Sequence, residues 1–330
     1  MLIIFAAACS DEDDDNGDDT SIRVVTSLPL ITDMVENVAG GRAEVDSLLP
    51  PGADPHTYEP SPNDVRKVAE AEIAFANGLS LEPGAMGVIE ANLPSGAALV
   101  ELAEVALEMG VEPIEGDHDP SDEGDHYDED EHADEEDEHA EEEDDHGKDA
   151  HDHEGGNPHL WLDPVNGALY AEIIRDTLID ADPDGRADYE ENYAEYAATL
   201  SETATHMTEA TSGVPEEHRK IVSTHDAFDY MARAIGFEVA GFVAPGPGQE
   251  PSPADIAELI ETIQNLGVPA VFAEPQTDAE ARTLEQIADE AGAEVCTLYS
   301  DSFSEDVSTY VDILRFNADE LARCLGGDGG

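Results

Sequence analysis

Basic residues are scarce in this chain. Its 330 residues include 13 lysines and arginines against 80 aspartates and glutamates, which gives a formal net charge of −67. Proteins that bind nucleic acid need clustered Lys and Arg side chains to neutralise phosphates. The composition therefore argues strongly against nucleic acid as a partner. A nucleotide site finds no support either, because neither G-x-G-x-x-G nor G-K-[ST] occurs.

Long apolar runs are also lacking. The first eight residues are apolar and end in small side chains directly before Cys9, but they are too few to span a bilayer. Such a start, followed by an Asp-rich spacer, resembles the remnant of a lipoprotein signal peptide. We predict that residues 1–20 are signal remnant and acidic spacer, and that a lipid on Cys9 attaches the protein to a membrane. The alternative is an ordinary apolar N-terminus.

Cysteine is rare, with three in the whole chain. Apart from Cys9, the remaining pair is Cys296 and Cys324. Exported proteins commonly oxidise such a pair, and a bridge here would join a strand-like segment to the last helix. Two buried thiols are the alternative.

What the sequence does contain is a repeated alternation of short β-branched runs with amphipathic helices of about ten residues. This alternation favours an α/β protein with parallel sheets. We predict two Rossmann-like lobes, residues 21–183 and residues 213–330. Between them, residues 184–212 read as one long linking helix of about 40 Å. Its apolar stripe is Tyr189, Tyr193, Tyr196, Leu200, Thr203 and Met207. The final helix is expected from about residue 305.

An Asp-, Glu- and His-rich tract at 115–156 interrupts the first lobe. Its charge and its lack of apolar residues predict disorder. We interpret it as a weak secondary metal-binding loop, and the alternative is a solvated spacer. The tract contains seven histidines: His118, His126, His132, His139, His146, His151 and His153.

Three further histidines stand in short, dissimilar motifs. His56 follows Pro-Gly-Ala-Asp-Pro, His159 follows Asn-Pro, and His225 follows Ser-Thr. Loops at strand ends carry function in α/β folds, so these motifs can converge. Neutral imidazole is the commonest protein ligand for zinc-like cations. The three motifs therefore predict a metal centre.

Five ordered segments carry a family resemblance. The chain resembles the zinc/manganese-type solute-binding lipoproteins of ABC transporters (cluster A), and within them the zinc-type subgroup. The resemblance implies a metal site in the cleft between the lobes, with His56 and His159 from the first lobe and His225 and Asp301 from the second. The segments are 48–61, 157–164, 223–228, 271–276 and 298–302.

The resemblance also implies a setting. An ABC permease and its ATPase would be the partners, and the lipid-anchored protein would lie on the outer face of the cytoplasmic membrane, in the periplasm or at the cell surface. We expect a monomer. Manganese-type relatives have a carboxylate where this chain has His225, so a nitrogen-rich site favours Zn²⁺ over Mn²⁺.

Around the ligands, Asp163 and Asp226 are candidates to orient imidazole N–H groups. Glu274 is expected to structure the loop between the lobes, and Asp301 has an alternative role as a helix N-cap. The predicted function is high-affinity zinc capture for an importer. Alternatives are a manganese or iron receptor of the same family, or a zinc-buffering or adhesive surface lipoprotein. A zinc hydrolase is disfavoured, because no H-E-x-x-H occurs and a carboxylate would close the open metal position; no enzyme is expected.

Overall fold

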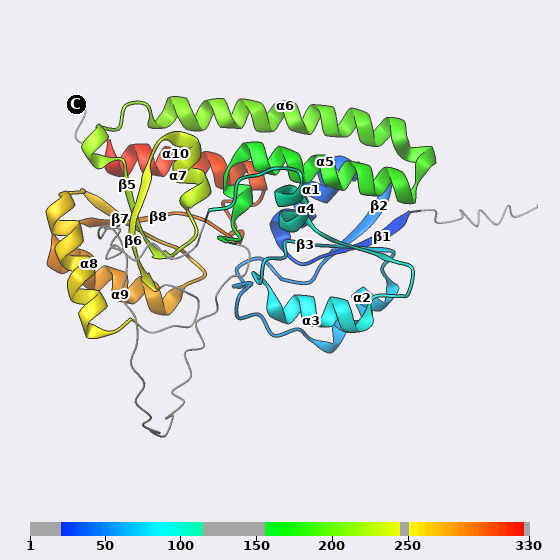
Figure 1. Cartoon of the computed structure of the whole chain (residues 1–330), viewed down its shortest axis with the longest axis horizontal. Helices are drawn as coiled ribbons and strands as arrows, with labels where there is room; N and C mark the ends of the chain where they lie inside the picture. The colour runs from blue at the N-terminus through cyan, green and yellow to red at the C-terminus, as the bar shows by residue number, and fades with distance from the viewer. Residues whose placement is uncertain (1–20, 115–155, 245–250, 327–330) are drawn as a thin grey trace, which may run out of the picture.

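The computed structural model describes residues 21–114, 156–244 and 251–326. Two α/β lobes lie side by side, and one long helix runs along both of them (Figure 1). This confirms the predicted fold class. The predictions for Cys9 and for the seven histidines of the acidic tract concern residues outside the described ranges.

The first lobe is built on a parallel sheet of order β2-β1-β3-β4. Its central strands are buried, as expected for a sheet covered by helices on its faces. The strands are β1 (Ile22–Thr26), β2 (Ala43–Ser47), β3 (Ile73–Ala76) and β4 (Ala98–Glu101). The helices are α1 (Pro29–Ala39), α2 (Pro62–Glu70), α3 (Pro83–Asn92), α4 (Leu102–Glu108) and α5 (Pro164–Ala181).

The second lobe repeats this order as β6-β5-β7-β8, again parallel. In both lobes the chain changes direction across the sheet between the two central strands, and α/β proteins bind their ligands at the carboxyl ends of strands near such a point. The strands are β5 (Lys220–His225), β6 (Glu238–Ala244), β7 (Ala270–Ala273) and β8 (Glu294–Thr297). The helices are α7 (Asp229–Ile235), α8 (Pro253–Leu266), α9 (Asp278–Ala291) and α10 (Tyr310–Leu325).

The linking helix is α6 (Arg186–Thr211), which packs on α5, α1 and α10. Tyr196, Leu200 and Met207 of the expected stripe are buried. Tyr193 is only half-buried, and the Arg175 guanidinium lies 4.4 Å from the centre of its ring. The prediction for the last helix was wrong by five residues, because α10 begins at Tyr310, where Thr309 caps it by accepting a hydrogen bond from the Asp312 amide.

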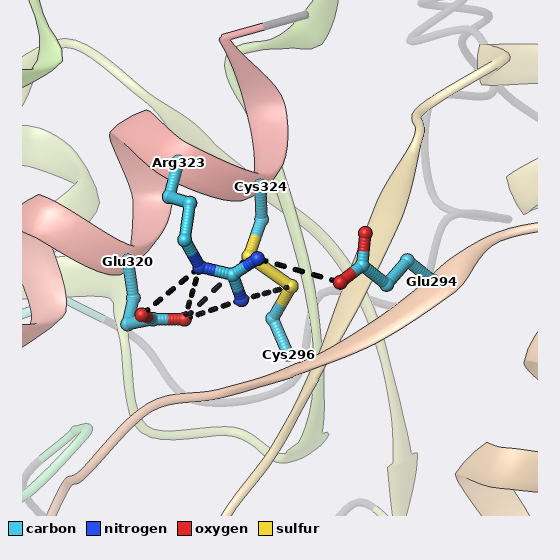
Figure 2. The surroundings of a disulfide bond; sticks show 5 residues. All are labelled: Glu294, Cys296, Glu320, Arg323 and Cys324. Carbon is cyan, nitrogen blue, oxygen red and sulfur yellow. Dashed lines mark hydrogen bonds and ion pairs between the residues drawn. A yellow bond between two sulfur atoms is a disulfide. The ribbon is translucent and has the colours of Figure 1, made fainter.

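Cys296 and Cys324 form a disulfide that ties β8 to α10 (Figure 2). Arg323 lies beside it, donating to Glu320 and to Glu294. The bridge settles the choice that the sequence left open. No helix in the described part of the chain is long and apolar enough to cross a membrane.

Candidate metal centre

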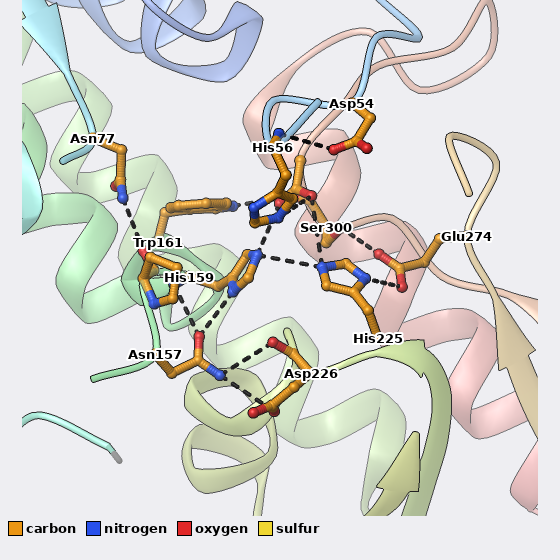
Figure 3. Close-up of polar contacts among 12 residues, drawn as sticks. Asp54, His56, Asn77, Asn157, His159, Trp161, His225, Asp226, Glu274 and Ser300 are labelled. Carbon is orange, nitrogen blue, oxygen red and sulfur yellow. Dashed lines mark hydrogen bonds and ion pairs between the residues drawn. The ribbon is translucent and has the colours of Figure 1, made fainter. Parts of the chain in front are cut away.

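Four of the predicted residues meet at one point in the cleft between the lobes. His56, His159, His225 and Asp301 each offer a ligand atom, and these four atoms lie within 4.8 Å of one another. The Nε2 atoms of His159 and His225 are 3.4 Å apart, and His159 Nε2 is 3.3 Å from Asp301 Oδ1. Figure 3 shows the imidazoles turned toward one another. Such spacing suits four ligands around a single cation.

The fold explains this convergence. His225 is the last residue of β5, and Asp301 follows β8. His56 lies in the loop after β2, and His159 immediately precedes the short 3-10 helix Leu160–Leu162. The carboxyl ends of parallel strands meet at one edge of a sheet, and the two lobes present these edges to each other. Residues distant in sequence therefore reach a common point.

Hydrogen bonds at the far side of two rings fix the tautomers. His225 Nδ1 lies 2.8 Å from Glu274 Oε1, and His159 Nδ1 lies 2.8 Å from Asn157 Oδ1. The Asn157 amide is oriented unambiguously, because its nitrogen donates to the Asp229 carboxylate while its oxygen also accepts from the His159 amide. Both Nδ1 atoms must therefore be donors. In the neutral rings the Nε2 lone pairs then point into the shared site, as metal binding requires.

Glu274 is the main charge behind the site. It is 1% exposed and accepts hydrogen bonds from Thr224 Oγ1 and Ser300 Oγ as well as from His225. Burial by itself lowers the pKa of His225, but the carboxylates of Glu274 and Asp301 outweigh burial and raise that pKa to about 10. Without a cation, the site therefore keeps a proton on His225.

Asp301 supplies the negative charge inside the cluster. Both of its carboxylate oxygens are buried, and neither accepts a hydrogen bond from the described residues. Burial raises the pKa of Asp301, but the neighbouring His159, His225 and His56 have the larger combined effect and lower it. A buried carboxylate without hydrogen bonds is costly. A divalent cation would remove that cost, so the donor set fits a metal ion.

The cavity beside the cluster is small. It has a volume of about 40 Å³ and is lined in part by Asp54, Gln276 and Glu280. Pockets for organic ligands usually measure hundreds of Å³. The space suits a bare ion and leaves no room for an ester or peptide substrate.

Of the two expectations about supporting residues, the one for Asp163 was wrong and the one for Asp226 stays a prediction. The Asp163 carboxylate caps α5 by accepting a hydrogen bond from the Val165 amide, which is a structural role at the helix end. The Asp226 carboxylate lies 3.4 Å from the amide nitrogen of Asn157, and Asn157 in turn contacts the His159 ring. Glu274 and Asn157 take the orienting role instead. Asn157 could have been found from the sequence, since it stands two residues before His159 in the same motif.

Comparison with known proteins identifies the family of this chain. The profile of the family described as "Zinc-uptake complex component A periplasmic" (ZnuA) matches residues 24–324. The chain belongs to this family. It is therefore a metal-binding, extracytoplasmic solute-binding protein of the ABC-transporter class and not an enzyme.

The names of proteins similar to this ZnuA-family chain refer to two different metals, zinc and manganese. The manganese-binding lipoprotein MntA of Halalkalibacterium halodurans is 28% identical over 98% of this chain and 96% of its own length. The manganese ABC transporter substrate-binding lipoprotein PsaA of Streptococcus pneumoniae is 27% identical over 98% and 95%. Among solved structures, the periplasmic zinc-binding protein TroA of Treponema pallidum superposes with a TM-score of 0.73 at 25% identity, covering 92% of this chain and 99% of TroA. A manganese-bound periplasmic metal-binding protein from Candidatus Liberibacter asiaticus gives 0.72 at 25% identity, covering 92% and 98%.

Proposed function

We propose that this protein captures Zn²⁺ outside the cytoplasmic membrane and delivers it to the permease of an ABC importer that a cytoplasmic ATPase drives. The observation that carries the proposal is the cluster of three imidazoles and one carboxylate, with ligand atoms within 4.8 Å of one another. His56, His159, His225 and Asp301 are its proposed ligands. A lipid on Cys9 as membrane anchor agrees with the lipoprotein names of the relatives.

The choice of zinc depends on the chemistry of the ligands. Three nitrogen donors suit a borderline cation, whereas a harder cation such as Mn²⁺ prefers more oxygen. The ligand at position 225 decides this balance, because a carboxylate there would make the site half oxygen. Relatives named for manganese support Mn²⁺ as the second candidate.

Calorimetry with Zn²⁺ and with Mn²⁺ tests the proposal. The full chain should bind one Zn²⁺ tightly, and Mn²⁺ much more weakly. The acidic tract adds weak sites, which a variant lacking residues 115–154 separates from the tight one. His225→Glu should reduce the difference in affinity between Zn²⁺ and Mn²⁺. His206→Ala is the matched control, because His206 lies at the surface beside Asp319. Equal affinities of the parent chain for both metals would contradict the zinc assignment.

A zinc-buffering role is the second candidate function. Its support is the acidic tract, whose seven histidines could hold further ions loosely. Transport assays distinguish the two roles. A cell lacking this protein should lose zinc uptake at low external zinc if the protein is a receptor, and should keep its uptake if the protein is a buffer.

A further inference from the structure

The loop that carries His56 is fastened directly to the loop that carries Asp301. The Gly52 amide donates a hydrogen bond of 2.6 Å to Ser302 Oγ, across 250 positions of sequence. Gly52 lies four residues before His56, and Ser302 is the immediate neighbour of Asp301. The Ser302 residue is 2% exposed. One side-chain hydroxyl thus joins the first-lobe ligand loop to the second lobe.

The other three ligands are braced together more deeply. Trp161 Nε1 donates to the Ser300 carbonyl at 3.0 Å, which links the segment of His159 to that of Asp301. The Glu274 carboxylate accepts from both His225 and Ser300. All three contacts are buried; the Trp161–Ser300 bond joins the two lobes, and the two bonds to Glu274 lie within the second lobe. These contacts tie His159, His225 and Asp301 to one another, so we expect the three to stay together when the His56 loop moves.

The Gly52–Ser302 contact, in contrast, lies at the rim. Gly52 is exposed, and a hollow of about 310 Å³ opens beside the contact, lined by Pro51, Gly52, Ser302 and Phe303 among others. Water in the hollow can hydrate the Gly52 amide once the bond breaks, so opening leaves no unsatisfied donor there. Segments with exposed hydrogen bonds open with the least free energy. The Gly52–Ser302 bond is only partly buried, because its donor residue is exposed, so we expect it to open before the fully buried contacts.

We propose that Ser302 is a positioning residue that holds the His56 loop closed, and that the bound cation leaves by losing His56 before the other ligands. This inference rests on the proposed function of the site. The hydrogen bond fastens the loop in its closed position, so its loss should accelerate release; an ion that enters while the loop is open should be captured at an unchanged rate. A single neutral hydrogen bond corresponds to about a fivefold change in a rate.

Release can be followed through the protein's single tryptophan. Trp161 lies 5.3 Å from the His159 ring, so its fluorescence reports on the site. The full chain loaded with Zn²⁺ is mixed with excess chelator, and association is measured separately. Ser302→Ala should release about five times faster with an unchanged association rate, and Ser302→Thr, which keeps the hydroxyl, should stay near the parent. Ser304→Ala is the matched control, because Ser304 bonds within its own lobe to Tyr299 and Val307.

A double-mutant cycle tests the route through His56. If Ser302 acts by holding His56, then Ser302→Ala should add nothing to the release rate of a His56→Ala variant. Full additivity in this cycle would overturn the proposal. A Ser302→Ala variant that releases the ion at the parent's rate would also overturn it, and so would one whose association rate changes by the same factor as its release rate. Calorimetric stoichiometry distinguishes failure of this inference from failure of the proposed function. A parent chain that binds no ion would overturn both. Tight binding by the parent, together with an unchanged release rate for Ser302→Ala, would overturn only the role of Ser302.

Discussion

If His225 is a metal ligand as proposed, a proton and a divalent cation compete for its Nε2 atom. An ordinary histidine pKa near ~6.5 would confine this competition to acid solution. The Glu274 and Asp301 carboxylates overcome the effect of burial and raise the pKa of His225 to about 10. The proton is therefore bound at neutral pH and must leave when the metal enters, so affinity should rise by about tenfold per pH unit between pH 7 and pH 9.

Calorimetry in buffers of different ionisation enthalpy measures this proton release. The parent chain should release about one proton per ion at pH 8. Glu274→Gln keeps an oxygen that accepts from His225 but removes the charge, so it should release fewer protons and show a flatter pH dependence. An identical proton count for the parent and Glu274→Gln would contradict the assignment of the shift to Glu274.

A second buried carboxyl, Glu82, should make stability depend on pH. Glu82 is fully buried, and burial raises its pKa from 4.5 to about 7 despite a hydrogen bond from the Asn77 amide. Because the folded pKa exceeds the unfolded one, the contribution to stability is complete below pH 4.5 and is lost as the pH rises through 7. Glu82→Gln stays neutral, so at pH 8 it should be more stable than the parent by up to ~3 kcal/mol. Urea unfolding at pH 8 and pH 5 checks this. A difference in free energy of unfolding between Glu82→Gln and the parent that is as large at pH 5 as at pH 8 would contradict it.

At this scale the sequence located the four clustered side chains but not the groups behind them. His56, His159 and His225 stand in motifs, so short stretches of sequence identify them. Glu274 reaches His225 from another strand, and which of several nearby carboxylates does so depends on how β5 and β7 pair. The local sequence does not reveal that strand pairing, which is why the prediction for Asp163 was wrong.

Among the elements, β8 and α10 depend on a covalent link. The Cys296–Cys324 disulfide closes a loop of 28 residues, for which loop-closure entropy gives a stabilisation of about 3–4 kcal/mol. The double variant Cys296→Ser/Cys324→Ser should lose about this much free energy of unfolding in urea. Its zinc stoichiometry should stay at one, because the ligand loop after β8 is also held by Trp161 and Glu274. Loss of zinc binding in a folded double variant would show that the bridge itself shapes the site.

The sequence predicted helices and strands where the apolar periodicity was strong, and it missed an element whose residues are set by tertiary packing. The alternation of strands and helices and the long α6 followed from apolar spacing. Helix α3 did not, because it contains Gly84 and Gly87 and has little amphipathic character. A Cβ on Gly84 would lie 2.1 Å from the Tyr58 carbonyl oxygen. The glycine therefore lets α3 pack closely against the loop that follows His56, a tertiary requirement that weakens the local helix signal.

At the scale of the whole molecule, the two lobes share one apolar core. Buried residues of both sheets, of α5, α6 and α10 belong to a single cluster, while a second cluster lies on the α8 and α9 side of the second lobe. Tyr310 crosses between the lobes: its amide donates to Asp33, and its hydroxyl donates to the Trp161 carbonyl. Lobes joined in this way should shift little on binding, and movement should concentrate in the His56 loop.

The junction between α5 and α10 can test whether this shared core sets the metal site. Gly167 of α5 faces the Tyr310 ring so closely that an added Cβ would lie 2.1 Å from its hydroxyl oxygen and 2.7 Å from the attached ring carbon. The ring is fully buried and fixed at both ends, so Gly167→Ala must push the lobes apart. We expect a loss of stability of about 1–3 kcal/mol and weaker zinc binding, although Gly167 itself contacts no ligand. Gly213→Ala is the matched control, since a Cβ there would meet nothing within 4 Å. Calorimetry and urea unfolding of both variants measure the effect; a Gly167→Ala protein with the parent's zinc affinity would show that the cleft assembles independently of this junction.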